Sequence, residues 1–353
     1  MALAILRVER VRKALALALA LAILEVEIKR KVKRVKKAKA KAKADKLTIN
    51  NKLNNMEQEN SRQWRGKTGG TPWMQRTLVK CMKVMNIHLV YIAAGFMVPY
   101  YMIAHHKEYL SIYRFFRRRI GYGKTRSFWN VFVNHIKFSQ IIVDRFAAYS
   151  GKHFTFEVEG ADIMRKFESK DEGFVIISSH IGNYELAGYS LVAKKKRFNM
   201  LVFANETQTV MDNRNRALAK TNMCLLPIMG DMSHIFLMNN ALSNGEVVSM
   251  PGDRMFGSKK FADCMFFGER AKFPIGPYAL ALQKDVELMA MFVMKESTLK
   301  YRIIIKELLL PDNTLTLKER INTLAQEYAC CLESIVREYP VQWFNYYDFW
   351  QHE

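Results

Sequence analysis

The chain has 353 residues, half of them hydrophobic, which is enough for one large domain or two small ones with a substantial core. Its net charge of +22 is uneven, because residues 1–50 carry +11 (15 Lys/Arg minus 4 Asp/Glu) and the rest carry +11 (40 minus 29). This charge suits anionic lipid headgroups, phosphorylated substrates, an acidic carrier protein or nucleic acid. The cysteines form no CxxC pair and no zinc-like spacing with histidine, which excludes a CxxC redox motif and a zinc finger.

Residues 1–55 form a low-complexity basic extension that differs from the rest of the chain. Ala14–Ala22 alternates alanine and leucine, and Lys29–Lys46 is a basic run that ends in a Lys-Ala repeat. The apolar stretch is short, and Glu25 and the basic run follow it, which argues against a signal peptide. We interpret the segment as a non-native, disordered or helical extension and Met56 as a candidate native start.

Residues 56–110 are predicted to form an N-terminal membrane-anchor region. Within them, Met85–Ala104 contains no Asp, Glu, Lys or Arg over a length close to that needed to cross a bilayer core, although Pro99 would kink a helix here. Tyrosines lie toward the ends of the segment, as interfacial aromatics do. We expect a spanning or re-entrant anchor, and the alternative is a buried core helix.

A basic cluster with interleaved aromatic residues, Tyr113–Arg119, follows the apolar segment. Beside an anchor, such a cluster favours an anionic membrane surface. A nucleic-acid patch and a solvated helix face are the alternatives.

From residue 128 onward, apolar segments at helical spacing alternate with short strand-like runs, which predicts an α/β fold with a mixed central sheet flanked by helices. Pro340 follows a helix for which Thr316 and Glu319 predict a capping box. The predicted helix and strands are Phe128–Tyr149, Phe154–Val158, Phe174–Ser178, Met200–Ala204, Val247–Met250, Val286–Met294 and Tyr301–Leu309.

A histidine and a glutamate follow the strand Phe174–Ser178, with four residues between them. Gly182 permits a tight turn, Asn183 suits a helix start, and Glu185 would then lie in the first helical turn. We predict that His180 acts as a general base and that Glu185 accepts one imidazole N–H and orients the ring. The alternative is a histidine that ends a strand beside a glutamate on a solvated helix.

The run HIGNYE at 180–185 resembles the first block of the bacterial lipid A biosynthesis (lauroyl/myristoyl) acyltransferase family, within the lysophospholipid acyltransferase-like superfamily. Related glycerolipid enzymes usually have Asp where this chain has Glu185. Three later blocks are also similar to this family, in the same order: Asn244–Gly257, Phe266–Ala281 and Pro340–Trp350. Where members of this family often have an Arg-Pro pair, this chain has Phe-Ala-Asn-Glu-Thr, beginning at Phe203. This departure leaves the identity of the acceptor lipid open.

This resemblance implies that residues 111–353 are an acyltransferase domain. It implies transfer of a fatty acyl chain from an acyl thioester, on acyl carrier protein or CoA, to a hydroxyl or amine of a lipid acceptor such as a lipid A precursor. No metal and no further cofactor are expected. We assign His180 and Glu185 as catalytic, and Asp253, Arg254 and Asn183 as substrate-binding, with Arg254 also a candidate oxyanion donor.

The resemblance also implies a bacterial inner-membrane enzyme whose active site faces the cytoplasm. Acyl carrier proteins are acidic, so the basic clusters Arg117–Arg119 and Lys194–Arg197 are candidate docking sites. Amino-acid lipids, lysophospholipids and pigment-type lipids are alternative acceptors. Two alternative functions are non-catalytic. One is an inactive membrane protein with this fold, and the other is a basic protein that binds nucleic acid or membrane. We expect no nucleic-acid partner, because the sequence contains no nucleic-acid-binding motif.

Overall fold

The structure is a computed structural model that describes residues 72–186, 196–203, 222–228, 233–255 and 260–350. The chain divides into two compact units, Met1–Gln63 and Trp64–Glu353, and every described element lies in the second. The extension at 1–55, Lys194 and Gly257 lie outside the described residues. The predicted domain boundaries after residues 55 and 110 stay predictions.

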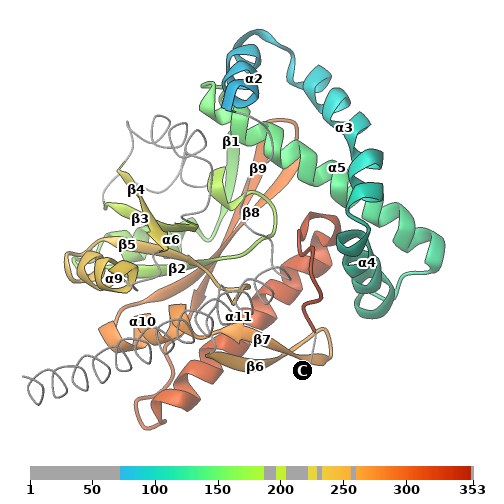
Figure 1. The fold of residues 1–353 in the computed structure, drawn as a ribbon. Helices are drawn as coiled ribbons and strands as arrows, with labels where there is room; N and C mark the ends of the chain where they lie inside the picture. The colour runs from blue at the N-terminus through green and yellow to red at the C-terminus, as the bar shows by residue number, and fades with distance from the viewer. Residues whose placement is uncertain (1–71, 187–195, 204–221, 229–232, 256–259, 351–353) are drawn as a thin grey trace, which may run out of the picture. The chain divides into compact units, whose positions relative to one another are not determined.

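A seven-stranded sheet forms the centre of the second unit (Figure 1). Its strand order is β1-β9-β8-β2-β5-β3-β4, and every neighbouring pair is parallel except β8 and β9. The strands are β1 Thr155–Glu159, β2 Phe174–Ser178, β3 Phe198–Phe203, β4 Met223–Ile228, β5 Val247–Pro251, β8 Leu288–Ser297 and β9 Lys300–Leu308. The predicted mixed α/β sheet is therefore confirmed.

Helices cover both faces of the sheet, and a hairpin of β6 Phe261–Phe266 and β7 Glu269–Pro274 packs beside the helix α11 Leu317–Glu338. The N-terminal part consists of α2, the predicted apolar helix α3, α4 and a π-helical turn at Phe115–Arg119. The helices are α2 Pro72–Val84, α3 Ile87–Ala104, α4 His106–Arg114, α5 Lys124–Tyr149, α6 Ala161–Glu168, α9 Ser233–Ser243, α10 Gly276–Lys284 and α11 Leu317–Glu338, with a 3-10 turn at Pro340–Gln342.

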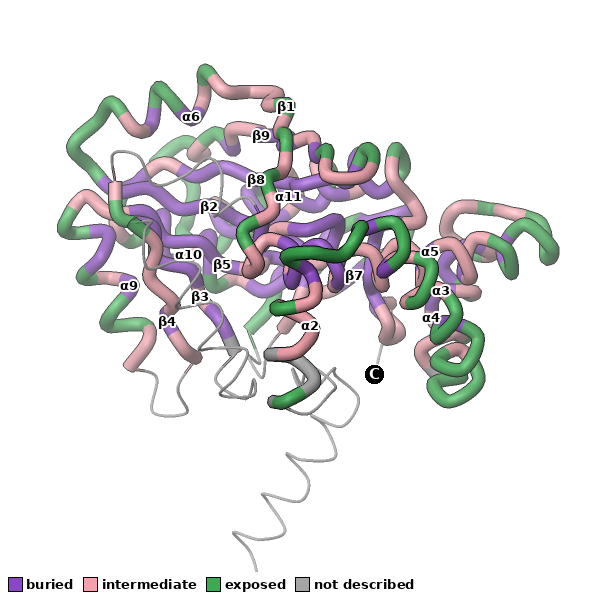
Figure 2. Tube along the Cα trace, turned by 90° about the horizontal axis from the view of Figure 1, so that it is seen from above, coloured by how far each residue is buried: buried purple, intermediate pink, exposed green. Residues whose placement is uncertain are grey.

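The central strands are buried on both faces, which explains why their sequences are continuous apolar runs (Figure 2). In β2, Val175 and Ile177 point to the core shared with α10 and α11, whereas Phe174 and Ile176 point to the core shared with α5 and α6. This period of two fixes the register of β2 and hence the position of the residues that follow it.

The predicted capping box is confirmed at the start of α11. The Thr316 side chain accepts a hydrogen bond from the Glu319 backbone N–H, and the Glu319 carboxylate accepts one from the backbone N–H of Thr316. This helix buries its apolar stripe against the sheet, and its Tyr328 hydroxyl donates to the carbonyl of Ser178, the last residue of β2, at 2.9 Å.

Candidate active site

Two adjacent parallel strands end beside each other and carry the candidate catalytic residues. Ser178, the last residue of β2, lies opposite Pro251, the last residue of β5. His180 and Asp253 each lie two residues beyond these strand ends. Because parallel strands end at one edge of the sheet, the matched register brings the two side chains together.

His180 and Asp253 form a buried pair. The Nδ1 atom of His180 lies 2.8 Å from Oδ1 of Asp253, and the His180 backbone N–H donates to Oδ2 at 2.7 Å. The Asp253 side chain is 1 % exposed and that of His180 is 14 % exposed. A carboxylate at Nδ1 holds a proton on that nitrogen, so proton exchange with a substrate falls to Nε2.

The surroundings lower the pKa of both members of this pair. Burial lowers the pKa of His180, Arg254 lowers it further, and the Asp253 carboxylate opposes both effects. Burial alone would raise the pKa of Asp253, but His180 and Arg254 outweigh it, so the pKa of this carboxyl is lowered. A neutral imidazole beside a carboxylate is the form that acts as a general base.

The residues His180–Asn183, which we call the histidine turn, are held by backbone contacts on two sides. The backbone N–H of Gly182 donates to the Gln342 carbonyl at 2.9 Å, and that of Asn183 donates to the Val293 carbonyl at 2.8 Å. Gly182 has a φ of 59°, as the predicted tight turn requires. The Pro340–Trp350 block thus supports the histidine turn directly.

Glu185 lies at the beginning of a helix that starts at residue 184, as predicted, but its described partners are on α5. Its carboxylate lies 3.4 Å from Nε of Arg145 and accepts a hydrogen bond from the Tyr149 hydroxyl at 2.5 Å. The carboxylate described at Nδ1 of His180 is Asp253, which comes from the neighbouring strand. The predicted pairing of His180 with Glu185 stays a prediction, and Asp253 is a second carboxylate that contacts this imidazole.

The other two predicted substrate-binding residues lie in different environments. Asn183 is fully buried, and its side chain lies 3.5 Å from both Nε of Arg145 and the Tyr301 hydroxyl. Arg254 lies next to Asp253, donates to the Phe344 carbonyl at 3.1 Å, and influences His180 electrostatically. Arg254 thus remains beside the candidate base, whereas Asn183 faces inward.

Sequence reasoning missed the α5 residues Arg145 and Tyr149. The signal that points to them is the pair Asp144-Arg145 inside an otherwise apolar helical stretch, since buried charges are retained mainly where they are paired. Tyr347 was also missed; its hydroxyl donates to the Asp253 carbonyl at 3.1 Å and steadies that strand end.

Several basic residues predicted for carrier docking make contacts within the chain. Lys196 donates to three backbone carbonyls, those of Asp171, Glu172 and Gly245. Arg117 donates to the Tyr122 carbonyl, and Arg119 pairs with Glu269. Arg118 is exposed. Among the described residues, no group of three or more His, Cys, Asp or Glu is arranged to hold a metal ion.

The sequence profile of the family described as bacterial lipid A biosynthesis acyltransferase matches residues 139–351, more than half of the chain. No curated protein sequence matches the chain. The matched region includes the histidine turn, the Asp253 strand end and the Pro340–Trp350 block, so the family resemblance noted from these motifs is confirmed. This chain belongs to the bacterial lipid A biosynthesis acyltransferase family and is an acyltransferase.

Proposed function

We propose that this enzyme transfers a fatty acyl chain from an acyl thioester to a hydroxyl of a lipid A precursor, with His180 as base and Asp253 as the carboxylate that orients it. The contact of 2.8 Å between Nδ1 of His180 and Asp253 is the observation that carries this proposal. The lowered pKa of His180, which favours the neutral imidazole, supports it further.

In the proposed reaction, Nε2 of His180 removes the proton of the acceptor hydroxyl as its oxygen attacks the thioester carbonyl. A tetrahedral oxyanion forms, and we assign the stabilisation of its negative charge to the guanidinium of Arg254. The C–S bond then breaks, the ester C=O re-forms, and the departing thiolate takes the proton from the imidazolium. Asp253 stabilises the imidazolium between these two proton transfers.

Glu185 has a different part in this proposal. Through Arg145 and Tyr149 it ties the segment after the histidine turn to α5. Glu185 and Asn183 are therefore positioning residues, and they act on the substrate only through the histidine turn.

The test uses purified enzyme, an acylated carrier and a lipid A precursor, with the product measured by mass spectrometry. His180→Ala and Asp253→Asn should each lower turnover by roughly 10²- to 10⁴-fold while the thermal transition is retained. His153→Ala changes an exposed histidine and serves as the matched control. Turnover close to that of the unaltered enzyme in either test variant contradicts the proposal.

We propose acyl carrier protein as the donor, docked beside Arg118. The carrier is acidic and Arg118 is exposed, so charge attraction would favour the encounter. Arg118→Glu should raise KM for the acylated carrier about 2- to 10-fold without changing kcat, and added salt should reduce this difference. Lys318→Glu, at an exposed position near the start of α11, is the control. An unchanged KM excludes carrier docking at this residue.

We further propose that the enzyme works at the bacterial inner membrane with its active site facing the cytoplasm. One described helix, Ile87–Ala104, is long and apolar enough to cross a membrane, and the family's acceptor is a lipid. Fractionation of cells that produce the enzyme should recover its activity with the inner membrane. Activity that remains in the soluble fraction contradicts this location.

A further inference from the structure

Helix α3 packs lengthwise against α5, which is itself part of the folded core. Ile87 and Val90 near the start of α3 share a cluster with Val143 and Phe146 near the end of α5. Farther along α3, Gly95 lies against Ile136, because a Cβ built there would meet the Ile136 Cδ1 atom at 3.4 Å. The two helices therefore run side by side in opposite directions (Figure 1).

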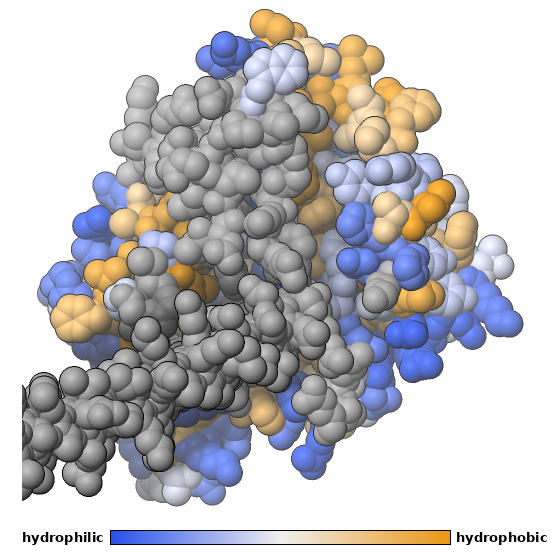
Figure 3. Space-filling view, viewed as in Figure 1, coloured by the Kyte–Doolittle hydropathy of each residue, from blue (hydrophilic) through white to orange (hydrophobic). Residues whose placement is uncertain are grey.

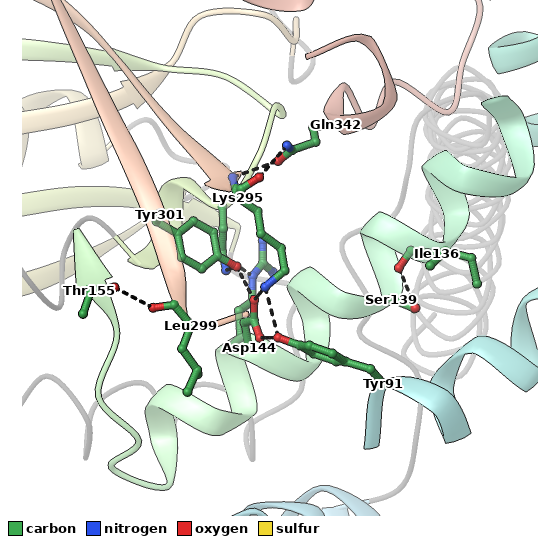
Figure 4. A network of polar contacts seen from close by, with 11 residues as sticks. Tyr91, Ile136, Ser139, Asp144, Thr155, Lys295, Leu299, Tyr301 and Gln342 are labelled. Atoms are coloured by element: carbon green, nitrogen blue, oxygen red, sulfur yellow. Dashed lines mark hydrogen bonds and ion pairs between the residues drawn. The ribbon is translucent and has the colours of Figure 1, made fainter. Parts of the chain in front are cut away.

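A buried polar cluster also joins α3 to the core (Figure 4). The Tyr91 hydroxyl donates to Asp144 of α5 and accepts a hydrogen bond from Nζ of Lys295 on β8 at 3.0 Å. Nζ of Lys295 lies 2.5 Å from the Asp144 carboxylate, and both side chains are almost completely buried. Departure of α3 from α5 would uncover this ion pair, so the cluster favours the packed arrangement.

The face of α3 that points away from α5 is apolar and exposed. Only 17 % of the helix is buried, and Leu89, Phe96 and Ile103 are among its most exposed residues. These three residues are spaced by seven, so they form one stripe along the helix. Hydrophobic side chains gather over the region of α2 and α3 in Figure 3. An exposed apolar stripe of this length marks a lipid or protein contact.

Basic residues lie on both sides of α3 in the sequence. Lys80 and Lys83 precede it, and Arg114 and the run Arg117–Arg119 follow it. Basic flanks resist translocation across a bacterial membrane, so this pattern favours both ends of the helix on one side. Of these residues, Lys80, Lys83 and Arg118 are exposed, and exposed basic residues beside an apolar stripe complement anionic lipid headgroups.

We propose that α3 lies in the plane of an anionic membrane, with the Leu89–Phe96–Ile103 stripe in the lipid and the opposite face held by α5, rather than crossing the bilayer. The choice of a lipid surface rests on the proposed function, whose acceptor is a lipid. The in-plane orientation rests on the packing against α5 and on the Tyr91–Asp144–Lys295 cluster. Both ends of α3 then stay on the side that carries the active site.

The first experiment measures the depth of the stripe in vesicles of phosphatidylethanolamine and phosphatidylglycerol. Spin labels are attached to Leu89→Cys, Phe96→Cys and Ile103→Cys in full-length enzyme whose native cysteines are replaced and whose turnover is retained. An in-plane helix gives all three labels the same depth in the lipid. A spanning helix gives depths that change by about 10 Å between successive labels, since each residue rises about 1.5 Å.

The second experiment measures the side on which each end of α3 lies. Lys83→Cys and Arg118→Cys are treated with a membrane-impermeant thiol reagent in intact spheroplasts and in inverted vesicles. Both positions should react only in the inverted vesicles, and reaction on opposite sides overturns the proposal.

Label depths that increase or decrease steadily from Leu89 to Ile103 overturn the proposal. So do labels that meet no lipid because another chain segment or a second copy covers them. A third such result is binding to phosphatidylcholine vesicles that is as strong as binding to the anionic vesicles. Acyl transfer is measured on every variant. An active enzyme with graded depths overturns the in-plane orientation alone, whereas an inactive unaltered enzyme overturns the proposed function.

Discussion

Two buried carboxylates, Asp253 and Glu185, lie close to His180 in the fold or in the sequence, and pH dependence distinguishes their roles. Asp253 contacts the imidazole and the backbone N–H of His180, whereas Glu185 contacts Arg145 and Tyr149. A charge that touches the imidazole changes its pKa directly. A charge that holds a neighbouring segment mainly changes stability.

The acid limb of kcat/KM for the unaltered enzyme should lie below the ordinary histidine pKa of about 6.5, because burial and Arg254 lower the pKa of His180. Asp253→Asn removes an anion that stabilises the imidazolium, so the limb should move to still lower pH. Arg254→Met removes a cation, so the limb should move to higher pH. Rates measured from about pH 4 to 8 locate each limb.

Glu185→Gln is the matched comparison for Asp253→Asn. It should leave the acid limb in place and lower the free energy of unfolding by about 1–3 kcal/mol, since it weakens a nearly buried ion pair. If Glu185→Gln moves the limb downward and Asp253→Asn does not, Glu185 orients the imidazole, as the sequence alone predicted.

At the level of single elements, the histidine turn depends on the absence of a side chain at Gly182. A Cβ at this position would lie 2.0 Å from the Val293 backbone carbonyl, and φ is 59°. Gly182→Ala should therefore cost about 1–3 kcal/mol in the free energy of unfolding and lower kcat by displacing His180. Chemical denaturation and single-turnover rates measure the two effects.

Gly276→Ala provides the control for this substitution. Gly276 begins α10, and an added Cβ would make only an ordinary contact, 3.6 Å from the Met250 side chain. Its stability should stay within about 0.5 kcal/mol of the unaltered enzyme. Equal effects of Gly182→Ala and Gly276→Ala would show that the shape of the histidine turn tolerates a side chain.

The elements that the sequence predicted well are those with strong local signals. The strand Phe174–Ser178 has the predicted bounds, because it is a continuous apolar run beside turn residues, and the Thr316 capping box is likewise a local pattern. The edge strand Met223–Ile228 was not predicted; it is only partly buried and contains Pro227, a residue that argues against a strand.

The contact between His180 and Asp253 has no local signal. It depends on the register between β2 and β5, whose paired residues lie 73 positions apart in the chain. Glu185 is the nearest carboxylate in sequence, so sequence reasoning could propose it but could not find Asp253. The contact of Glu185 with Arg145 of α5 likewise joins residues 40 positions apart and has no local signal.

Across the second unit as a whole, α5 links the apolar helix to the candidate active site. Asp144 contacts Tyr91 on α3, Lys295 on β8 and Tyr301 on β9, and the Tyr301 hydroxyl lies 3.5 Å from the Asn183 amide. Next to Asp144, Arg145 contacts Glu185. The packing of α3 and the position of the histidine turn therefore both depend on neighbouring residues of α5.

Tyr91→Phe tests this link, because it removes one hydroxyl from the polar cluster and keeps the ring. The buried Asp144 and Lys295 each lose a hydrogen bond, so the free energy of unfolding should fall by about 1–2 kcal/mol. Tyr100→Phe removes a hydroxyl from an exposed ring on the same helix and should change stability by less than about 0.5 kcal/mol.

The same two variants test whether the cluster also positions the histidine turn. If it does, Tyr91→Phe should lower kcat even when the rate is measured at a temperature well below that of unfolding. KM for the acyl donor should stay unchanged. Identical stability and kcat in the two variants would mean that α3 is held by apolar packing alone.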